Sequence, residues 1–146
     1  MSVIERIPDI KTLGDAVPFV GRIREIIEVI QLFEDFEPLE LEALARYMRC
    51  YRAPLGAEII RESDVGDFMV LILEGSVEIV KKDIRGQAQI MGTAGPGKTL
   101  GEMSLIDGEP RFASCVALEP VTFAVLDRES LSRILAEEPR LGVKLM

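Results

Sequence analysis

Residues 92–99 match the phosphate-loop pattern G-x-x-x-x-G-K-[ST] at every position, as Gly-Thr-Ala-Gly-Pro-Gly-Lys-Thr. In that motif backbone amides and the lysine bind nucleotide phosphates, and a long helix must follow directly because its N-terminal amides complete the site. Here Gly101, Gly108 and Pro110 interrupt the residues that follow, which leaves room for little more than one helical turn. We therefore expect a Gly-Pro turn between strands, and a P-loop nucleotide triphosphatase is only the second alternative.

A second group of residues suited to phosphate lies immediately downstream. Glu102 follows Gly101, and Arg111 comes nine residues after the glutamate. A guanidinium can donate two parallel hydrogen bonds to one phosphate, a geometry that an ammonium cannot reproduce. The glycine allows close approach of the backbone. Glu102 and Arg111 could also be an ordinary ion pair that braces a loop.

Histidine is absent from the chain. This excludes imidazole base catalysis, a Ser-His-Asp triad within the chain and the commonest zinc ligand. The two cysteines, Cys50 and Cys115, form no CxxC pair and are expected to be reduced thiols.

The stretch around Glu102 and Arg111 resembles the phosphate-binding cassette of the cyclic nucleotide-binding domain family, roughly F-G-E-x-(A/S)-L-(L/I)-x-x-x-x-R-x-A-(T/S)-V. Upstream features that also fit are Leu32-Phe33, the stretch from Gly56 through Gly66-Asp67, Leu73-Glu74-Gly75 and the turn Gly95-Pro96-Gly97. The family includes the catabolite activator protein and the regulatory subunits of cAMP-dependent kinase. The resemblance covers about residues 30 to 142.

The resemblance implies that Arg111 pairs with the cyclic phosphate and that Glu102 accepts a hydrogen bond from the ribose hydroxyl. It also implies a binding protein with no catalytic residue, cofactor or metal. The expected ligand is cAMP, with cGMP as the other candidate. The ligand-binding residues implied are Gly101, Glu102, Met103, Ser104, Arg111, Phe112, Ala113 and Ser114. The alternative is a ligand-free β-roll of the same fold that serves as an interaction or dimerisation scaffold.

Two features depart from the family pattern. Phe112 stands where the family's nucleotide binders carry a small residue, so its ring either points away from the pocket or narrows it. The chain stops at Met146, whereas family members continue into a long helix that covers the base. The base-capping residue therefore has no candidate in this sequence.

Charge and composition limit the partners. Of 146 residues, 17 are basic and 25 acidic, and this net charge of −8 argues against nucleic-acid binding. No helix-turn-helix is expected, so we predict a stand-alone cytoplasmic sensor of bacterial signal transduction. Its partner would be a second copy or another protein that contacts the terminal helices. The amphipathic stretch at 20–32 is expected to pack in the core, and a partner surface is the alternative for it. The longest apolar run, 68–73, is too short to cross a membrane.

The elements that must position these residues follow from glycine spacing and apolar periodicity. Short apolar segments between turn glycines predict strands within 58–61, 68–73, 76–81, 87–91, 113–117 and 121–126. Apolar residues at helical spacing predict helices from Val20 to Ile30, from Pro38 onward, and from a cap at Asp127 to near Pro139.

The predicted fold class is α+β, an antiparallel jelly-roll β-roll flanked by N- and C-terminal helices. We expect residues 1–146 to form a single domain. Its parts would be an N-terminal helical segment (1–50), the β-roll (51–126) with the cassette at 101–115, and a C-terminal helical segment (127–146).

Overall fold

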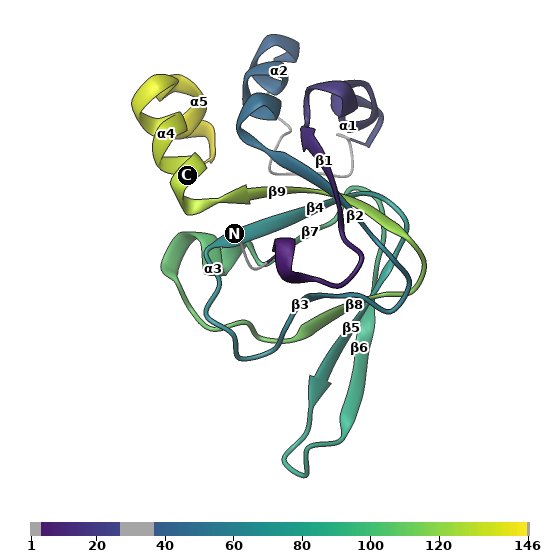
Figure 1. The fold of residues 1–146 in the computed structure, drawn as a ribbon. Helices are drawn as coiled ribbons and strands as arrows, with labels where there is room; N and C mark the ends of the chain where they lie inside the picture. The colour runs from purple at the N-terminus through teal and green to yellow at the C-terminus, as the bar shows by residue number, and fades with distance from the viewer. Residues whose placement is uncertain (1–3, 27–36, 146) are drawn as a thin grey trace.

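The computed structural model describes residues 4–26 and 37–145 (Figure 1). The strands are β1 (Lys11–Asp15), β2 (Arg49–Ala53), β3 (Glu58–Ile60), β4 (Phe68–Glu74), β5 (Val77–Lys82), β6 (Ala88–Ala94), β7 (Thr99–Leu100), β8 (Ser114–Ala117) and β9 (Val121–Asp127). The helices are α1 (Val20–Ile26), α2 (Pro38–Tyr47), α3 (Glu102–Asp107), α4 (Arg128–Glu137) and α5 (Pro139–Leu145), with short 3-10 turns η1 (Ile4–Arg6) and η2 (Val17–Phe19).

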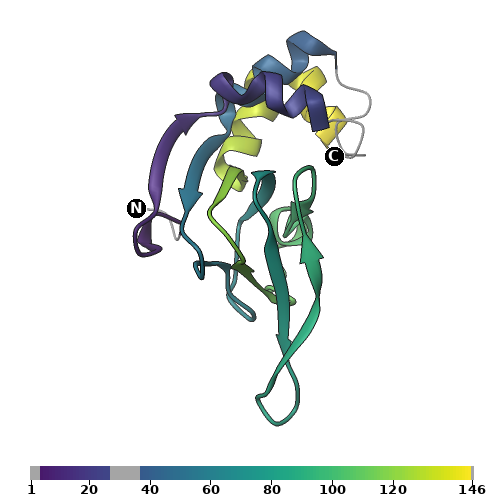
Figure 2. The same ribbon diagram turned by 90° about the vertical axis from the view of Figure 1, so that its right-hand side faces the viewer.

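All strand pairs in the described residues are antiparallel and form two sheets. The first sheet has the order β1-β2-β9-β4-β7 and the second the order β3-β8-β5-β6. The helices α1, α2, α4 and α5 gather on one side of the roll, and the β5–β6 hairpin projects from the opposite side (Figures 1 and 2). The predicted antiparallel β-roll with flanking helices is confirmed.

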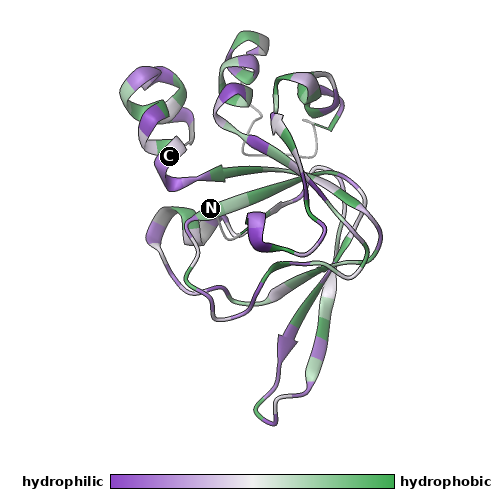
Figure 3. Cartoon of the chain, in the orientation of Figure 1, coloured by the Kyte–Doolittle hydropathy of each residue, from purple (hydrophilic) through white to green (hydrophobic). Residues whose placement is uncertain are grey.

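The first sheet separates two hydrophobic cores, because its central strands are buried on both faces. Along β4, alternate residues enter the core beneath the helices (the helix core) or the core between the two sheets (the roll core). Met69, Leu71 and Leu73 belong to the helix core, and Phe68, Val70 and Ile72 belong to the roll core. Figure 3 shows the predominantly hydrophobic colouring of β4 and β9. A strand buried on both faces reads as a continuous apolar run, as 68–73 does.

Some elements differ from the sequence prediction. The segment before residue 50 was expected to be helical, but β1 pairs with β2 at the edge of the first sheet. Strands β2 and β7 were also not predicted. Residues 139–145, which lie in the segment expected to be helical, form α5. A Cβ at Gly142 would overlap Leu135 of α4, so glycine allows these two helices to pack closely.

The predicted helix ends are confirmed where the structure describes them. Pro38 occupies the first turn of α2, and the side chain of Asp127 accepts a hydrogen bond of 2.7 Å from the Ser130 N–H at the start of α4. The structure does not describe residues 27–36. The predicted continuation of the first helix beyond Ile26 and the pair Leu32-Phe33 fall in this range.

Candidate functional site

The segment that mimics a phosphate loop is a turn between two strands. Ala94 ends β6, the Gly97 N–H bonds to the Ile72 carbonyl at 2.9 Å, and Thr99 begins β7. The helix that follows, α3, has six residues and begins after Gly101, whose φ of 77° is in the left-handed region. The loop is therefore followed by a two-residue strand and a six-residue helix, and the long helix that a phosphate loop requires is not found at residues 92–107.

Arg111 is buried although it carries a charge, with 5% of its surface exposed. Its guanidinium donates hydrogen bonds to the carbonyl of Gly101 at 3.0 Å and to that of Phe68 at 2.6 Å. The guanidinium also lies over the Phe68 ring, with Arg111 Cζ 4.4 Å from the ring centroid. These contacts fix the guanidinium plane, and they use two of its five N–H donors.

Two glycines make room for this guanidinium. A Cβ at Gly66 or at Gly101 would overlap the Arg111 side chain. At Gly101 the positive φ also favours glycine. At Gly66 the φ is not positive, so only the lack of space beside Arg111 requires glycine. The backbone of Arg111 is held as well, because its N–H donates to the Asp64 carbonyl and its carbonyl accepts from the Ser63 N–H, each at 2.8 Å.

Burial lowers the pKa of the Arg111 guanidinium from its ordinary value, while the nearby Cys115, Asp67 and Asp64 act in the opposite direction. Removing a charge from water is costly unless charged or polar groups compensate it. A buried cation at a cavity wall is therefore suited to an anion, which supplies charge-assisted hydrogen bonds.

A cavity of about 240 Å³ opens beside Arg111. It is lined by the predicted site residues Gly101, Glu102, Ser104, Arg111, Phe112 and Ala113, together with Ile60, Ile79, Leu100, Glu109, Pro110 and Cys115. Met103 lies in α3, and its side chain is outside the described part of the chain. The fold thus brings Arg111 and Glu102 to one cavity.

The polar side chains of the cassette differ in what they contact. Glu102 Oε1 accepts a hydrogen bond from the Thr99 hydroxyl at 3.1 Å, and Ser104 Oγ donates to the Glu109 carbonyl at 2.8 Å. Ser114 is not among the residues that line the cavity, and its Oγ accepts from the Glu62 N–H at 2.9 Å. The hydroxyls of Ser104 and Ser114 therefore brace the loops around the cavity.

Phe112 lies at the edge of the cavity and does not fill it. Its side chain belongs to neither core, and 68% of its surface is exposed. The Phe112 ring thus contributes to the cavity lining while most of its surface stays exposed.

The cassette is connected to the C-terminal helices through Arg128, the first residue of α4. Its guanidinium donates to the Leu105 carbonyl at 3.1 Å and to the Ser104 carbonyl at 3.3 Å, near the end of α3. Its backbone N–H donates to the Asp67 carbonyl at 2.7 Å. A displacement of α3 would therefore act directly on the start of α4.

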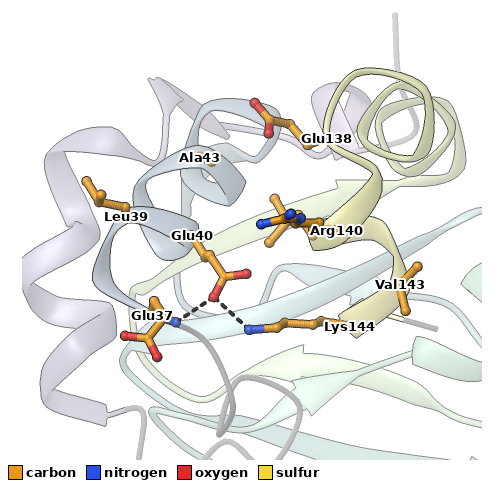
Figure 4. Close-up of a pocket in the computed structure, with 9 residues that line it drawn as sticks. Glu37, Leu39, Glu40, Ala43, Glu138, Arg140, Val143 and Lys144 are labelled. Atoms are coloured by element: carbon orange, nitrogen blue, oxygen red, sulfur yellow. Dashed lines mark hydrogen bonds and ion pairs between the residues drawn. The ribbon is translucent and has the colours of Figure 1, made fainter.

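A larger hollow of about 760 Å³ lies between α2 and α5 (Figure 4). Glu40 lies within it and accepts hydrogen bonds from the Glu37 N–H at 2.9 Å and from Lys144 Nζ at 2.7 Å. The side-chain hydrogen bond from Lys144 lowers the pKa of the Glu40 carboxyl. The Glu40–Lys144 contact joins α2 to α5, and the residues that line the hollow come from the same region. The hollow therefore lies between two helices, away from the cassette.

Sequence reasoning missed the residues that hold Arg111 from a distance. Phe68 and Gly66 lie more than forty residues before it, on the loop and strand that pass beneath the cassette. Arg128 was missed as well. Gly66, two residues before the apolar run at 68–73, was noted from the sequence as a turn glycine and as part of the family resemblance, without its contact to Arg111.

Together, the β-roll with terminal helices and a buried arginine in a short helical cassette define the class of protein. The family model of the cyclic nucleotide-binding domain matches residues 52–138. The chain therefore belongs to the cyclic nucleotide-binding domain family.

Individual relatives agree with this assignment. A solved cyclic nucleotide-binding domain from Methylobacillus flagellatus is 44% identical, with a TM-score of 0.86, and the match covers 94% of this chain and 78% of that one. The cyclic AMP receptor protein of Thermus thermophilus is 32% identical over 78% of this chain and 53% of its own length. The CRP-like cAMP-activated global transcriptional regulator of Mycobacterium tuberculosis is 27% identical over 84% of this chain and 54% of its own length. The chain thus spans about half the length of these two curated relatives.

Two further features bear on the function. Among the described residues no group of histidine, cysteine, aspartate or glutamate side chains could hold a metal ion. Within the same part of the chain, no helix is long and apolar enough to cross a membrane.

Proposed function

We propose that this chain is a regulatory sensor domain that binds a cyclic nucleotide, cAMP in the first place, in the cassette cavity. The observation that carries the proposal is the buried guanidinium of Arg111, which two backbone carbonyls hold beside Glu102 at one cavity wall. The curated relatives described above, whose names refer to cAMP, support the choice of ligand.

The chemistry of the site suits a cyclic phosphodiester. Such a ligand carries one negative charge, which the N–H donors of Arg111 not bonded to Gly101 and Phe68 can receive. Glu102 has carboxylate oxygens at the same cavity and can accept a hydrogen bond from a ribose hydroxyl. The proposal involves no chemical conversion of the nucleotide.

Ligand binding acts on the terminal helices through two contacts. Arg128 ties the end of α3 to the start of α4, and the Glu40–Lys144 ion pair ties α2 to α5. A ligand that binds better to one arrangement of α3 shifts the population of helix positions. We infer that the terminal helices then present this change to another protein or to a second copy, and not to nucleic acid.

Isothermal titration calorimetry with cAMP, cGMP and ATP tests the proposal. The wild type should bind a cyclic nucleotide, and Arg111→Lys should weaken this binding by at least about tenfold, because an ammonium cannot form the two-point contact. Arg61→Lys is the matched control, since Arg61 is exposed and pairs with Glu58 on the surface.

The outcomes separate the alternatives. No heat with any nucleotide from a folded wild type would favour the ligand-free scaffold and contradict the proposal. Binding of ATP that is lost in Lys98→Ala would instead favour a nucleoside triphosphate site at the 92–99 turn.

A further inference from the structure

Phe112 is a large aromatic side chain left at the surface beside a cavity. It follows Arg111 and precedes Ala113, and all three line the cavity, yet 68% of the phenylalanine is exposed. Exposure of a ring forgoes the free energy that burial would give. Because Phe112 packs in neither core, the fold itself does not account for it.

The ring is held in place by the neighbouring strand β5. Lys81 Nζ lies 4.0 Å from the centroid of the Phe112 ring and also donates to the Phe112 carbonyl at 2.9 Å. The same ammonium pairs with Glu62 Oε1 at 3.3 Å.

Glu62 is itself fixed, so it holds the ammonium in turn. Its Oε2 accepts from the Lys82 N–H at 3.0 Å, and its own N–H donates to Ser114 Oγ at 2.9 Å. The hydrogen bond from the Lys82 backbone lowers the pKa of the Glu62 carboxyl, which keeps it ionised beside Lys81. Lys81 is therefore held over one face of the Phe112 ring, while the ring stays largely open to a further planar group.

The size of the cavity bears on which part of a bound nucleotide lies outside it and next to the ring. Small-molecule sites in proteins usually have volumes of roughly 300–1,000 Å³. The cavity beside Arg111, at about 240 Å³, is smaller. It suits the cyclic phosphate and ribose of a nucleotide and leaves the base at the mouth, where Phe112 lies.

We propose that Phe112 determines specificity by stacking on the base of the bound nucleotide, and that Lys81 is the residue that positions its ring. This inference rests on the proposed function, because it needs a cyclic phosphate at Arg111. Base–aromatic stacking tolerates different bases, but a purine offers a larger face than a pyrimidine. The site should therefore prefer purine over pyrimidine cyclic nucleotides.

Binding measurements with cAMP, cGMP, cCMP and cUMP test the role of the ring. Phe112→Ala should weaken binding of the purine ligands by roughly 5- to 100-fold and that of the pyrimidine ligands by less, so the preference shrinks. Phe112→Leu keeps an apolar side chain without the aromatic face and should behave similarly. The chain has no tryptophan, so Phe112→Trp introduces a single indole whose fluorescence should be quenched by cAMP.

A separate pair of variants tests the role of Lys81. Lys81→Met removes the cation and should weaken binding of cAMP by roughly two- to fivefold, whereas Lys81→Arg retains a cation over the ring and should restore binding. Lys82→Met is the matched control, because it removes a neighbouring lysine charge and keeps the backbone N–H that Lys82 donates to Glu62.

Failure of this inference differs from failure of the proposed function. If the wild type binds no cyclic nucleotide, or binds it equally well in Arg111→Lys, both are overturned. If binding depends on Arg111 but Phe112→Ala binds all four ligands like the wild type, and the indole fluorescence of the Phe112→Trp variant does not change with cAMP, only the role of Phe112 is overturned.

Discussion

Replacing Gly66 by alanine should displace the Arg111 guanidinium without altering any residue that lines the cavity. A Cβ at Gly66 would overlap the Nε, Nη2 and Cζ atoms of Arg111. The backbone at Gly66 is not in the left-handed region, so alanine is compatible with it. The whole effect of the substitution should therefore pass through the position of Arg111.

The expected loss follows from the two hydrogen bonds that the displaced guanidinium gives up, to Phe68 and Gly101. A hydrogen bond of a charged group contributes about 1.5–3 kcal/mol, but water recovers part of this, so we expect the free energy of unfolding to fall by about 1–3 kcal/mol. For a chain of this length that lowers Tm by roughly 2–12 °C. Affinity for cAMP should fall by at least about tenfold, since the guanidinium no longer presents fixed donors.

Thermal unfolding and calorimetry measure the two effects, with Gly21→Ala as the control. A Cβ at Gly21 in α1 meets nothing within 4 Å, so this variant should keep its affinity and gain slightly in stability. In the double variant Gly66→Ala/Arg111→Ala, the alanine at position 66 should cost little, because the side chain it displaces is gone. Wild-type Tm and affinity in Gly66→Ala would refute the described packing of the guanidinium.

Three further predictions concern the surroundings of the site. Arg128→Met removes the bonds to the Ser104 and Leu105 carbonyls and should lower the free energy of unfolding in urea by about 1–3 kcal/mol. Burial raises the pKa of the Cys50 thiol to about 12 and that of Cys115 to about 11. Because unfolded thiols ionise from about pH 8.5, stability should fall as the pH rises from there toward 11–12, and Cys50→Ala should weaken this dependence in denaturation measured at several pH values. Asp127→Ala should lower the free energy of unfolding by about 1 kcal/mol, whereas Asp127→Asn should retain most of the stability in thermal melts.

The parts of the fold that sequence reasoning predicted are those whose pattern is local. The run at 68–73 is apolar throughout because β4 is buried on both faces, and Pro38 and Asp127 act within one helical turn. In contrast, β1 is exposed along its whole length and lies at a sheet edge, so its sequence carries no apolar alternation.

The same distinction applies to the site. Arg111 and Glu102 could be found because their spacing follows a cassette, and the fold does bring them to one cavity. The contacts of Phe68 and Gly66 with Arg111 could not be found, because the one with Phe68 spans 43 positions and forms only when the chain is folded. The exposed ring of Phe112 likewise contacts Lys81 of β5, which lies 31 positions earlier in the chain.

The shared first sheet has a consequence for how the molecule tolerates substitution. Val70 lies in the roll core and its neighbour Leu71 in the helix core, so a single strand must satisfy two packed interiors at once. A substitution that changes side-chain volume in one core is accommodated by a shift of the β4 backbone, and this shift disturbs packing in the other core. Substitutions in the roll core and in the helix core are thus coupled, and neither core can be redesigned or exchanged as an independent part.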